Sequence, residues 1–332
     1  MTRKAIALIV LNLAAAAAVG LIAGLLYKGV SGTGDAVRDS EDRGFYSGEG
    51  GRDTGSLLES IASLAGETDA EIGVAAIFSD GDVFVYPEHF AEDTGGAFPL
   101  MSVMKFHQAL AVCGWLRENG VPLETRVNVT PEMLKPDTWS PLREKNPLGG
   151  SFSYAELLEY TLGESDNNAC DILFSYTGMP GWVDSYIRSY YGISDFRIEC
   201  TEEQMHENLA DCYRNWTTPL SAALLLEKFF EEHDSDVYME FLWKTMSQCR
   251  TGLSRIPGHI ADRAAMIVHK TGTGDITEGG RIMAVNDIGI VVLPDGSHFS
   301  LAVFIHDAGC PMSVCESVIA SIAQSVFMAA RI

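Results

Sequence analysis

The stretch IGVAAIFSDGDVFVY, residues 72–86, contains two apolar, β-type runs joined through Asp80 and Gly81. An Asp-Gly pair between two such runs is a strong signal for a β-hairpin. The same pattern recurs near the other end of the chain, where DIGIVVL and HFSLAVFI flank a Pro-Asp-Gly turn at residues 294–296. We therefore expect two antiparallel hairpins, one near each end of the folded region.

Helical patterns fill the sequence between these hairpins. Helical periodicity and helix caps dominate from about residue 103 to residue 241. One clear start is Ser153-Tyr-Ala-Glu156 before LLEYTL, because a serine and a glutamate three residues apart form a capping box. Further helical stretches lie at about 57–64 and 313–330, outside the two hairpins. The chain thus has β segments at both ends and a helical middle.

This order of elements predicts an α+β fold. We expect one antiparallel sheet built from both chain ends and packed with helices, with an all-helical lobe inserted between its halves. The α/β lobe is placed at about residues 57–98 and 251–332, and the helical lobe at about residues 99–250. A cleft between two lobes is the natural place for a small-molecule ligand.

The composition fits a folded protein with a small ligand. The 332 residues are 47% apolar and 20% charged, and they suffice for a folded region of roughly 250 residues. The formal net charge is −22, whereas nucleic acids and anionic membrane surfaces require a basic footprint on their partner. Neither is expected as a partner. An anionic ligand would need local cations to counter the overall negative charge.

The N-terminal segment is typical of an exported protein. Arg3 and Lys4 precede an uncharged apolar stretch, residues 5–27. A cleavable signal core has roughly 7–15 apolar residues and a membrane span needs about 20, so residues 1–29 form either an anchor or a cleaved signal peptide. Residues 30–56 are rich in Gly, Ser and Asp and are expected to form a flexible linker. The folded remainder is expected outside the cytoplasm, in the periplasm or an equivalent compartment.

The stretch FPLMSVMKFHQALAV, residues 98–112, places Ser102 three residues before Lys105 in an apolar run. On a helix these positions share a face, so the hydroxyl and the amine come within hydrogen-bond reach. A serine needs a base to take its proton, and a desolvated lysine suits this task because burial disfavours its charged form. The competing interpretation is a capped helix with a lysine that extends to solvent, since Ser-x-x-Lys arises by chance about once in such a chain.

Two tripeptides favour the catalytic interpretation. Ser-Asp-Asn at residues 165–167 follows the helical LLEYTLGE, and Lys-Thr-Gly at residues 270–272 follows the apolar AAMIVH. Each tripeptide is expected by chance about once in several thousand residues. Their occurrence in this order after Ser102 and Lys105 is therefore improbable by chance.

The residue types of these tripeptides suit a single reaction. The hydroxyl of Ser165 can relay a proton to a leaving amine, and Asn167 can hold an amide of the substrate. Lys270 and Thr271 can bind a carboxylate. Gly272 allows an edge strand to approach the substrate closely. The pattern as a whole is that of acyl transfer to a serine.

These motifs make the chain resemble the class A serine β-lactamases. The resemblance extends from about residue 57 to the end. It includes Phe98-Pro99, Trp139-Ser140-Pro141, Thr251-Gly252 with Arg255, and Asn286-Asp287-Ile288-Gly289. It implies a β-lactamase/transpeptidase-like fold and a monomeric hydrolase of β-lactam antibiotics that confers resistance to them. No cofactor is implied, and no His-x-x-x-His or Cys-x-x-Cys spacing supports a metal site.

The resemblance assigns the first chemical step to four residues. Ser102 attacks the lactam carbonyl, and the N–H groups of Ser102 and Thr273 stabilise the oxyanion. Either Lys105 or Glu202, the latter through water, takes the proton of Ser102. Thr273 directly after Lys-Thr-Gly also favours cephalosporins among the substrates.

Further residues receive roles by the same resemblance. Ser165 and Lys270 protonate the ring nitrogen. Trp139 is either a gate to the substrate site or an ordinary core aromatic residue. Arg255 either supplements Lys270 in binding the substrate carboxylate or is a surface charge. The expected substrate-binding residues are Asn167, Thr271, Gly272, Thr273, Trp139, Arg255 and His206.

A hydrolase also needs a base for the second step, deacylation. The segment Cys-Thr-Glu-Glu-Gln-Met-His at residues 200–206 resembles the glutamate-bearing loop of extended-spectrum enzymes and cephalosporinases. By that match Glu202 activates the deacylating water, and Glu203 is its competitor. His206 stands where the family has an asparagine that helps to hold the water.

The neck of this loop departs from the family pattern. Cys200 and Asn215 replace the Arg/Asp pair that usually closes it, and a Cys200–Cys212 disulfide is one hypothesis for its closure. Seven cysteines in an exported chain permit disulfides, although the odd number leaves at least one thiol without a partner in the chain. Cys310 and Cys315 are a second closely spaced pair. The sequence assigns neither pair.

Two other functions share these motifs. A penicillin-binding DD-peptidase has all three but is expected to lack the deacylating loop, so the glutamate at residue 202 argues against it. A membrane-tethered β-lactam sensor would need a cytoplasmic output domain, and only four residues precede the apolar segment. The β-lactamase interpretation is therefore preferred.

Overall fold

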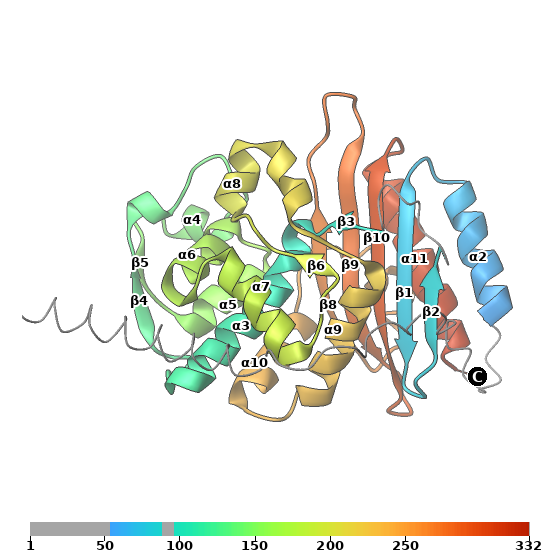
Figure 1. Ribbon diagram of the computed structural model, residues 1–332, viewed down its shortest axis with the longest axis horizontal. Coiled ribbons are helices and arrows are strands. Elements are labelled where there is room, and N and C mark those ends of the chain that lie inside the picture. Colours follow the sequence, from blue (N-terminus) through green and yellow to red (C-terminus); the bar gives the residue numbers. More distant parts are fainter. Residues whose placement is uncertain (1–53, 88–95, 332) are drawn as a thin grey trace, which may run out of the picture. The chain divides into compact units, whose positions relative to one another are not determined.

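The computed structural model describes residues 54–87 and 96–331 (Figure 1). The predicted anchor and the predicted linker up to residue 53 lie outside the described residues. Helix α2 (Thr54–Gly66) begins before the predicted end of the linker at residue 56. The helix thus starts three residues earlier than the boundary expected at residue 57.

One five-stranded antiparallel sheet joins segments from the two ends of the chain, as predicted. The first hairpin consists of β1 (Glu71–Phe78) and β2 (Val83–Tyr86), and the second of β9 (Ile282–Val292) and β10 (His298–Ala308). Strand β1 pairs with β10, and β8 (Met266–Thr273) completes the order β2-β1-β10-β9-β8. The edge strand β8 lies next to the helical lobe (Figure 1). The predicted α+β fold is confirmed.

Both faces of this sheet are covered, which explains why its central strands β1, β10 and β9 are mostly apolar and buried along most of their length. Val74 and Phe78 of β1 pack in a cluster with α2 and α11 (Met312–Ala329). Ala75 and Ile77 point to the other face and join a second cluster, the helix-side core, which continues into the helical lobe. Alternate residues of one strand therefore serve two cores.

Two helices show how the sheet is sandwiched (Figure 1). Helix α9 (Pro219–Glu232) belongs by sequence position to the predicted helical lobe, yet it contacts β1, β9 and β10 and contributes to the helix-side core. Helix α11 is long and apolar enough to span a membrane by composition alone, but its apolar face packs on the opposite side of the sheet. We therefore describe α11 as a core helix.

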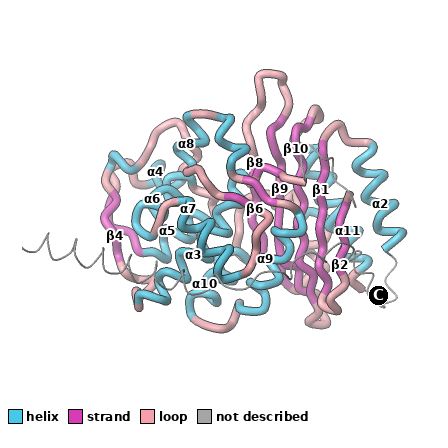
Figure 2. The backbone as a smooth tube through the Cα atoms, in the orientation of Figure 1, coloured by secondary structure: helices cyan, strands magenta, loops and turns pink. Residues whose placement is uncertain are grey.

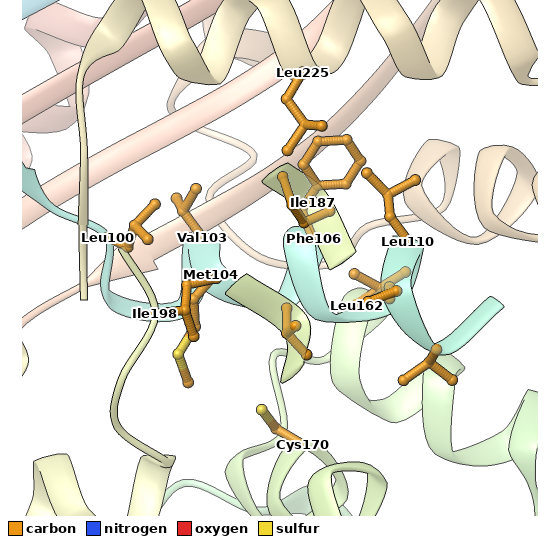
Figure 3. Close-up of a cluster of buried hydrophobic side chains, with 14 of the residues drawn as sticks. Leu100, Val103, Met104, Phe106, Leu110, Leu162, Cys170, Ile187, Ile198 and Leu225 are labelled. Atoms are coloured by element: carbon orange, nitrogen blue, oxygen red, sulfur yellow. The ribbon is translucent and has the colours of Figure 1, made fainter. Parts of the chain in front are cut away.

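Helix α3 (Met104–Asn119) is the centre of the helical lobe. Its side chains are buried on almost every side, as expected for a helix in the middle of a core. Phe106 and Leu110 lie near Leu162 and Leu225 from other helices (Figure 3). This packing gives the N-terminal end of α3 a rigid support.

The remaining helices surround α3 (Figure 2). The predicted capping box of Ser153 and Glu156 is present at the start of α5. The remaining helices of the helical lobe are α4 (Pro141–Lys145), α5 (Tyr154–Gly163), α6 (Asn167–Thr177), α7 (Pro180–Tyr186), α8 (Glu202–Glu207) and α10 (Val237–Ser247). Short helical segments of three to six residues lie at η2 (Pro131–Met133), η3 (Ile187–Tyr191), η4 (Leu209–Arg214) and η5 (Ile256–His259).

The helical lobe also contains short strands that the sequence does not predict. Strands β3 (Phe98–Pro99), β7 (Trp216–Thr217) and β6 (Phe196–Arg197) form a small sheet. This sheet joins the segment before α3 to the two ends of the loop that carries α8. Strands β4 (Arg126–Val129) and β5 (Gly150–Ser153) form a separate pair. Strands of two to four residues are too short to show a periodic pattern.

Candidate active site

The backbone turns sharply just before Ser102. Met101 follows β3 closely and has a φ of 47°, a left-handed conformation that is strained for a residue with a side chain and is often found at functional sites. The turn η1 (Met101–Val103) then leads directly into α3. Ser102 therefore lies at the N-terminal end of a buried helix, and its own side chain is partly exposed.

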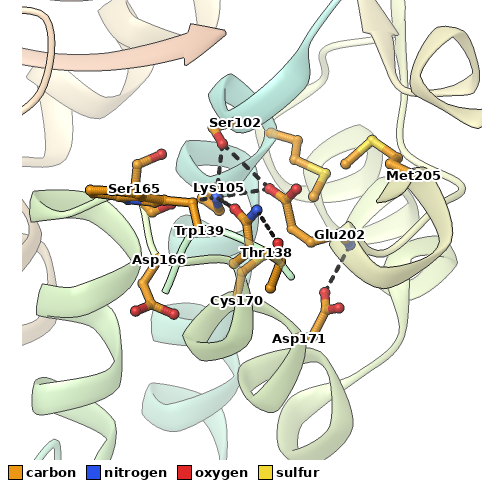
Figure 4. Close-up of polar contacts among 12 residues, drawn as sticks. Ser102, Lys105, Thr138, Trp139, Ser165, Asp166, Cys170, Asp171, Glu202 and Met205 are labelled. Carbon is orange, nitrogen blue, oxygen red and sulfur yellow. Dashed lines mark hydrogen bonds and ion pairs between the residues drawn. The ribbon is translucent and has the colours of Figure 1, made fainter. Parts of the chain in front are cut away.

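Lys105 is fully buried and has four oxygen atoms within hydrogen-bond distance of its Nζ (Figure 4). These are Ser102 Oγ at 2.8 Å, Asn167 Oδ1 at 2.6 Å, the Ser165 carbonyl oxygen at 2.9 Å and Glu202 Oε1 at 2.8 Å. An ammonium has only three N–H donors, so one contact is surplus. Of these four oxygen atoms, Ser102 Oγ alone carries a hydrogen when Glu202 is ionised. When Lys105 is uncharged, the Ser102 hydroxyl can therefore donate a hydrogen bond to Lys105 Nζ.

The two candidate glutamates point to different places. Glu202 is buried, and its Oε1 lies 3.4 Å from Ser102 Oγ. Glu203 is partly exposed and forms an ion pair with Lys135 at 2.8 Å. Within the described residues, Glu202 is therefore the member of the pair that contacts both Ser102 and Lys105.

Asp171 on α6 supports Glu202, although the sequence motifs do not include it. Its carboxylate accepts the backbone N–H of Glu202 at 2.9 Å and of Glu203 at 2.8 Å. These belong to the N–H groups that a helix start leaves without an intrahelical partner. Burial, followed by the charge of Glu202, raises the pKa of Asp171 to about 7. A signal exists in the sequence, because Asp171 lies four residues after Asn167 and shares its helix face.

Ser165 and Asn167 contact Lys105 from the helical side. Ser165 has a φ of 58°, and this turn directs its carbonyl oxygen to Lys105 while its hydroxyl faces β8. Asn167 uses its Oδ1 for Lys105 and donates from Nδ2 to Thr138 Oγ1 at 2.8 Å. Thr138 is a second residue that the motifs do not reveal.

Asp166 connects this segment to the region of Trp139. Its buried carboxylate accepts from Ser140 Oγ at 2.9 Å and from the Leu142 N–H at 2.6 Å, and burial raises its pKa. Trp139 is 57% exposed, and its Nε1 donates to the Glu164 carbonyl oxygen at 2.8 Å. The alternative of a core aromatic residue at Trp139 is therefore wrong.

Lys270 approaches Ser165 from the sheet. It is fully buried on β8, with its Nζ 2.9 Å from Ser165 Oγ and 2.7 Å from the Thr271 carbonyl oxygen. Burial, followed by the positive charge of Lys105, lowers the pKa of Lys270 to about 7. Ser165 thus lies between two buried lysines.

Gly272 brings β8 close to the turn that carries Ser102. A Cβ at Gly272 would lie 2.6 Å from the Leu100 carbonyl oxygen, a distance that real side chains do not reach. Only glycine therefore permits this approach. The neighbouring Thr271 directs its hydroxyl to Thr251, with 2.6 Å between the two Oγ1 atoms.

Arg255 is buried, so the alternative of a surface charge is wrong. Its Nη2 donates to Thr273 Oγ1 at 2.8 Å, and its Nη1 donates to the carbonyl oxygens of Gly272 at 3.1 Å and Asn286 at 2.9 Å. Its Nε donates to Glu316 Oε1 at 3.3 Å. The guanidinium thus supports the end of β8 and reaches the site through Thr273.

A cavity of about 260 Å³ lies beside Ser102. Six predicted residues are among those that line it, namely Ser102, Trp139, Asn167, Glu202, His206 and Thr273. The others do not line it, namely Lys105, Ser165, Lys270, Thr271, Gly272 and Arg255. His206 is exposed near the end of α8, and in the described part of the chain no hydrogen bond joins it to Glu202. His206 therefore shares the cavity with Glu202 but does not hold its carboxylate.

The neck of the Glu202 loop is closed by Asn215, which is fully buried. Asn215 Oδ1 accepts the N–H groups of Glu199 at 2.8 Å and Cys200 at 2.9 Å, and its Nδ2 donates to the Cys200 carbonyl oxygen at 2.8 Å. Cys200 and Cys212 are free thiols, and Cys212 Sγ faces the Met205 carbonyl oxygen at 3.8 Å. In the structure the Asn215 amide closes the neck, and no disulfide joins Cys200 to Cys212.

Comparisons with known proteins agree on one family. Residues 59–329 match the beta-lactamase enzyme family. The chain is 35% identical over 277 residues to a beta-lactamase of Phocaeicola vulgatus, which covers 82% of this chain and 84% of the relative. It is 34% identical over 274 residues to the extended-spectrum beta-lactamase PER-1 of Pseudomonas aeruginosa, with 82% and 86% covered.

A solved structure gives the same result. The crystal structure of the TLA-3 extended-spectrum beta-lactamase matches with a TM-score of 0.78 at 37% identity, covering 83% of this chain and 98% of that one. The fold and the sequence thus both indicate a β-lactamase, and the contacts of Ser102 are consistent with one. The chain belongs to the beta-lactamase enzyme family, within which it is a class A serine β-lactamase.

Proposed function

We propose that this β-lactamase opens the lactam ring through an acyl-enzyme on Ser102. The observation that carries the proposal is the contact of Ser102 Oγ with Lys105 Nζ at 2.8 Å and with Glu202 Oε1 at 3.4 Å. Either group can take the hydroxyl proton as the oxygen attacks the lactam carbonyl. Because Lys105 and Glu202 form an ion pair at 2.8 Å, the proton can pass between them.

The oxyanion that forms next is assigned to the N–H groups of Ser102 and Thr273. Both residues line the cavity, one from the helical lobe and one from the end of β8. The close approach that Gly272 permits supports this assignment, because it brings the two backbones together. Fixed donors aimed at a developing negative charge make a large contribution to acyl transfer.

Cleavage of the carbon–nitrogen bond requires a proton on the ring nitrogen, and we assign its delivery to Ser165. The contact of Ser165 Oγ with Lys270 Nζ at 2.9 Å supports a relay in which Lys270 replaces the proton that Ser165 gives up. The substrate carboxylate is assigned to Lys270 and Thr273, with Arg255 behind Thr273. Thr273 takes the place of the predicted Thr271, because the Thr271 hydroxyl faces Thr251 and Thr273 lines the cavity. Asn167 and Trp139 at the cavity are assigned to the rest of the substrate.

Deacylation is assigned to Glu202. Its buried carboxylate lies next to Ser102, where it can take a proton from a water that attacks the ester. The two N–H groups held by Asp171 support this role, because they fix the backbone of the first turn of α8. A base whose backbone is fixed is already positioned for proton transfer, so less conformational entropy is lost when it reacts.

We propose cephalosporins and penicillins as substrates, with cephalosporins preferred. PER-1 and TLA-3, at 34% and 37% identity, are named extended-spectrum beta-lactamases. Thr273 at the cavity and the cephalosporinase-like Glu202 loop support the same preference. A ratio of kcat/KM values for a cephalosporin and a penicillin below one would contradict it.

The role of Glu202 is tested by a pair of matched variants. Glu202→Gln should acylate at a similar rate to the wild type but deacylate roughly 100- to 10,000-fold more slowly, since this is the usual contribution of a general base. Glu203→Gln should keep near-normal turnover, because Glu203 pairs with Lys135 outside the cluster. Stopped-flow rates and mass spectrometry of the quenched protein measure both steps. Normal steady-state turnover by Glu202→Gln would refute the assignment.

We also propose that the enzyme acts outside the cytoplasmic membrane. The basic Arg3 and Lys4 before the apolar residues 5–27 support export. Cell fractionation should place the activity in the periplasm or at the membrane, and N-terminal sequencing of the mature protein distinguishes a cleaved signal from an anchor. Activity confined to the cytoplasm would contradict the proposal.

A further inference from the structure

Cys310 and Cys315 have their sulfur atoms in contact, away from the active site. The two Sγ atoms are 3.5 Å apart. Cys315 lies in the first turn of α11 and is fully buried in the cluster between this helix and the sheet. Cys310, which follows β10, is partly exposed. One thiol of the pair is thus accessible to a reagent and the other is protected.

The backbone holds both cysteines in place. The N–H of Gly309 donates to the Asp69 carbonyl oxygen at 2.7 Å, so the turn before Cys310 is attached to the segment that enters β1. The N–H of Cys315 donates to the Pro311 carbonyl oxygen at 3.3 Å and begins the helix. Bonded sulfurs lie about 2.05 Å apart, and we expect side-chain rotation to close the remaining distance.

We propose that Cys310 and Cys315 form a disulfide that links the end of β10 to the first turn of α11. The oxidant is a disulfide, either a small one such as oxidised glutathione or that of a thiol oxidoreductase. Such oxidants are present where exported proteins fold. The proposal concerns a modification site and does not depend on the assignments within the active site.

The reaction proceeds by thiol–disulfide exchange. The Cys310 thiolate attacks one sulfur of the oxidant, forms a mixed disulfide and releases one thiolate. The Cys315 thiolate then attacks the Cys310 sulfur and releases the second. In total two protein thiols lose two electrons and two protons, and the disulfide of the oxidant becomes two thiols. Burial, followed by the hydrogen bond with Cys310, raises the pKa of Cys315 to about 12, so the partly exposed Cys310 reacts first.

The linked turn also carries a residue that supports the active site. Glu316 follows Cys315 and accepts hydrogen bonds from Ser254 Oγ at 2.9 Å and from Arg255 Nε at 3.3 Å. Arg255 in turn donates to Thr273. A disulfide in this turn restrains the Glu316 carboxylate, which accepts the hydrogen bond from Arg255. It should also raise the melting temperature of the protein.

The test uses cleavage at methionine to read each cysteine pair separately. The purified full chain is equilibrated with oxidised glutathione or with dithiothreitol, its free thiols are blocked with N-ethylmaleimide, and it is cleaved with cyanogen bromide. Met312 separates Cys310 from Cys315, so fragments 284–312 and 313–328 stay joined only by their disulfide. Met205 separates Cys200 from Cys212, so fragments 180–205 and 206–239 provide an internal control.

We expect fragments 284–312 and 313–328 to be joined after oxidation and separate after reduction. Fragments 180–205 and 206–239 should be separate in both samples. The proposal is overturned if fragments 284–312 and 313–328 are separate in the oxidised sample. This holds if both cysteines carry N-ethylmaleimide, and it also holds if Cys310 carries glutathione. These masses are read without any assay of hydrolysis, so the result stands apart from the proposed function.

A variant checks the consequence for stability. Cys310→Ser changes a partly exposed residue and should abolish the difference in melting temperature between oxidised and reduced samples. Its β-lactam hydrolysis should equal that of the wild type in the reduced state. A melting-temperature difference that persists in Cys310→Ser would show that the stabilisation arises elsewhere and would overturn this part of the proposal. Cys315→Ala gives the same comparison from the buried side.

Discussion

Two buried lysines face Ser165 from opposite sides. Lys105 donates to its carbonyl oxygen at 2.9 Å, and Lys270 donates to its hydroxyl at 2.9 Å. Glu202 neutralises Lys105 by direct contact, whereas Lys270 has no carboxylate at such a distance among the described residues. Burial and the charge of Lys105 therefore lower the pKa of Lys270 to about 7, and its charge varies with pH in the neutral range.

The charge of Lys270 predicts a pH dependence of catalysis. Lys270 is protonated below about pH 7, so kcat/KM for a β-lactam that carries a carboxylate should fall as the pH rises through this value. A bound carboxylate favours the protonated lysine, and the decline in kcat should therefore occur at higher pH. Steady-state rates between pH 5 and 10, an interval of about five units around the neutral range, measure both profiles.

Lys270→Arg is the matched variant, because a guanidinium stays charged throughout this range. We expect the variant to be slower, since the arginine fork does not fit the lysine site, but its decline in kcat/KM should move to higher pH. The same decline at the same pH in both enzymes would contradict the role of Lys270.

The sequence reveals the residues that belong to a motif, but it does not show which backbone groups a supporting residue holds. Ser102 and Lys105 lie three residues apart, and their contact follows from helix periodicity alone. The positions of Asp171, four residues after Asn167, and of Asn215, at the neck of the Glu202 loop, can be read from the sequence, but the backbone N–H groups that they accept cannot. No local spacing encodes such contacts, because they exist only once the loop has folded against α6 and β7.

At the scale of elements, strands β8 and β9 are joined by a buried ion pair. His269 lies next to Lys270 on β8 and faces Asp287 of β9, with 3.0 Å between Nδ1 and Oδ1. Burial opposes the charge on His269, but Asp287 outweighs it and raises the pKa of His269 to about 10. Burial also opposes a thiolate at Cys249, but the hydrogen bond with His269 outweighs it and lowers the pKa of Cys249 to about 7.

Removal of His269 should destabilise the protein in a pH-dependent way. His269→Gln leaves Asp287 as an unpaired buried charge, which costs on the order of 3–5 kcal/mol. A raised pKa in the folded state means that the stabilisation by His269 is complete below about pH 6.5 and is lost as the pH rises through about 10. The difference in unfolding free energy between parent and variant should therefore shrink over that interval.

Urea unfolding at several pH values measures this difference. Both proteins should carry Cys249→Ser, because the thiol titrates in the same range and contacts His269. A destabilisation that stays constant from pH 6 to pH 10, an interval of about four units across the shifted range, would contradict the ion-pair account.

Element length decides what the sequence predicts. Both terminal hairpins are long enough to show β-type runs and a turn, and both are present. Strand β9 nevertheless begins at Ile282, before the predicted start at Asp287, because Asn286 and Asp287 interrupt the apolar pattern while remaining paired with β8. The two-residue strands β3, β6 and β7 show no pattern at all and form through tertiary contacts.

At the scale of the whole folded unit, one apolar core joins the sheet to the helical lobe. Phe229 of α9 packs against Phe106 of α3, with 5.5 Å between ring centroids. Phe304 of β10 packs against Phe98, with 5.8 Å between centroids. All four belong to the helix-side core. The two lobes predicted from sequence therefore share their packing, and we expect them to unfold together.

Tryptophan fluorescence can test this expectation, because all five tryptophans lie between residues 115 and 243, in the helical lobe and its α9 region. Far-UV circular dichroism reports on the sheet as well. The urea transitions seen by the two probes should coincide, as they do for a single cooperative unit. A fluorescence transition at a lower urea concentration would mean that the helical lobe unfolds separately.

The order of elements along the chain predicts the two-lobe architecture but not how far the lobes interpenetrate. Strands at both termini and helices between them suffice for the sheet and the inserted lobe. The position of α9 on the sheet does not follow from its amphipathic pattern, because such a pattern shows that one face is buried and not which element buries it.

The most direct test of the account is stopped-flow turnover of a chromogenic cephalosporin by the purified protein, with mass spectrometry of samples quenched during the reaction. We predict sustained hydrolysis, with an adduct on Ser102 that appears and disappears within each turnover. A single burst equal to the enzyme concentration, followed by a persistent adduct, would mean that the loop carrying Glu202 does not deacylate. The protein would then behave as a penicillin-binding protein rather than as a β-lactamase.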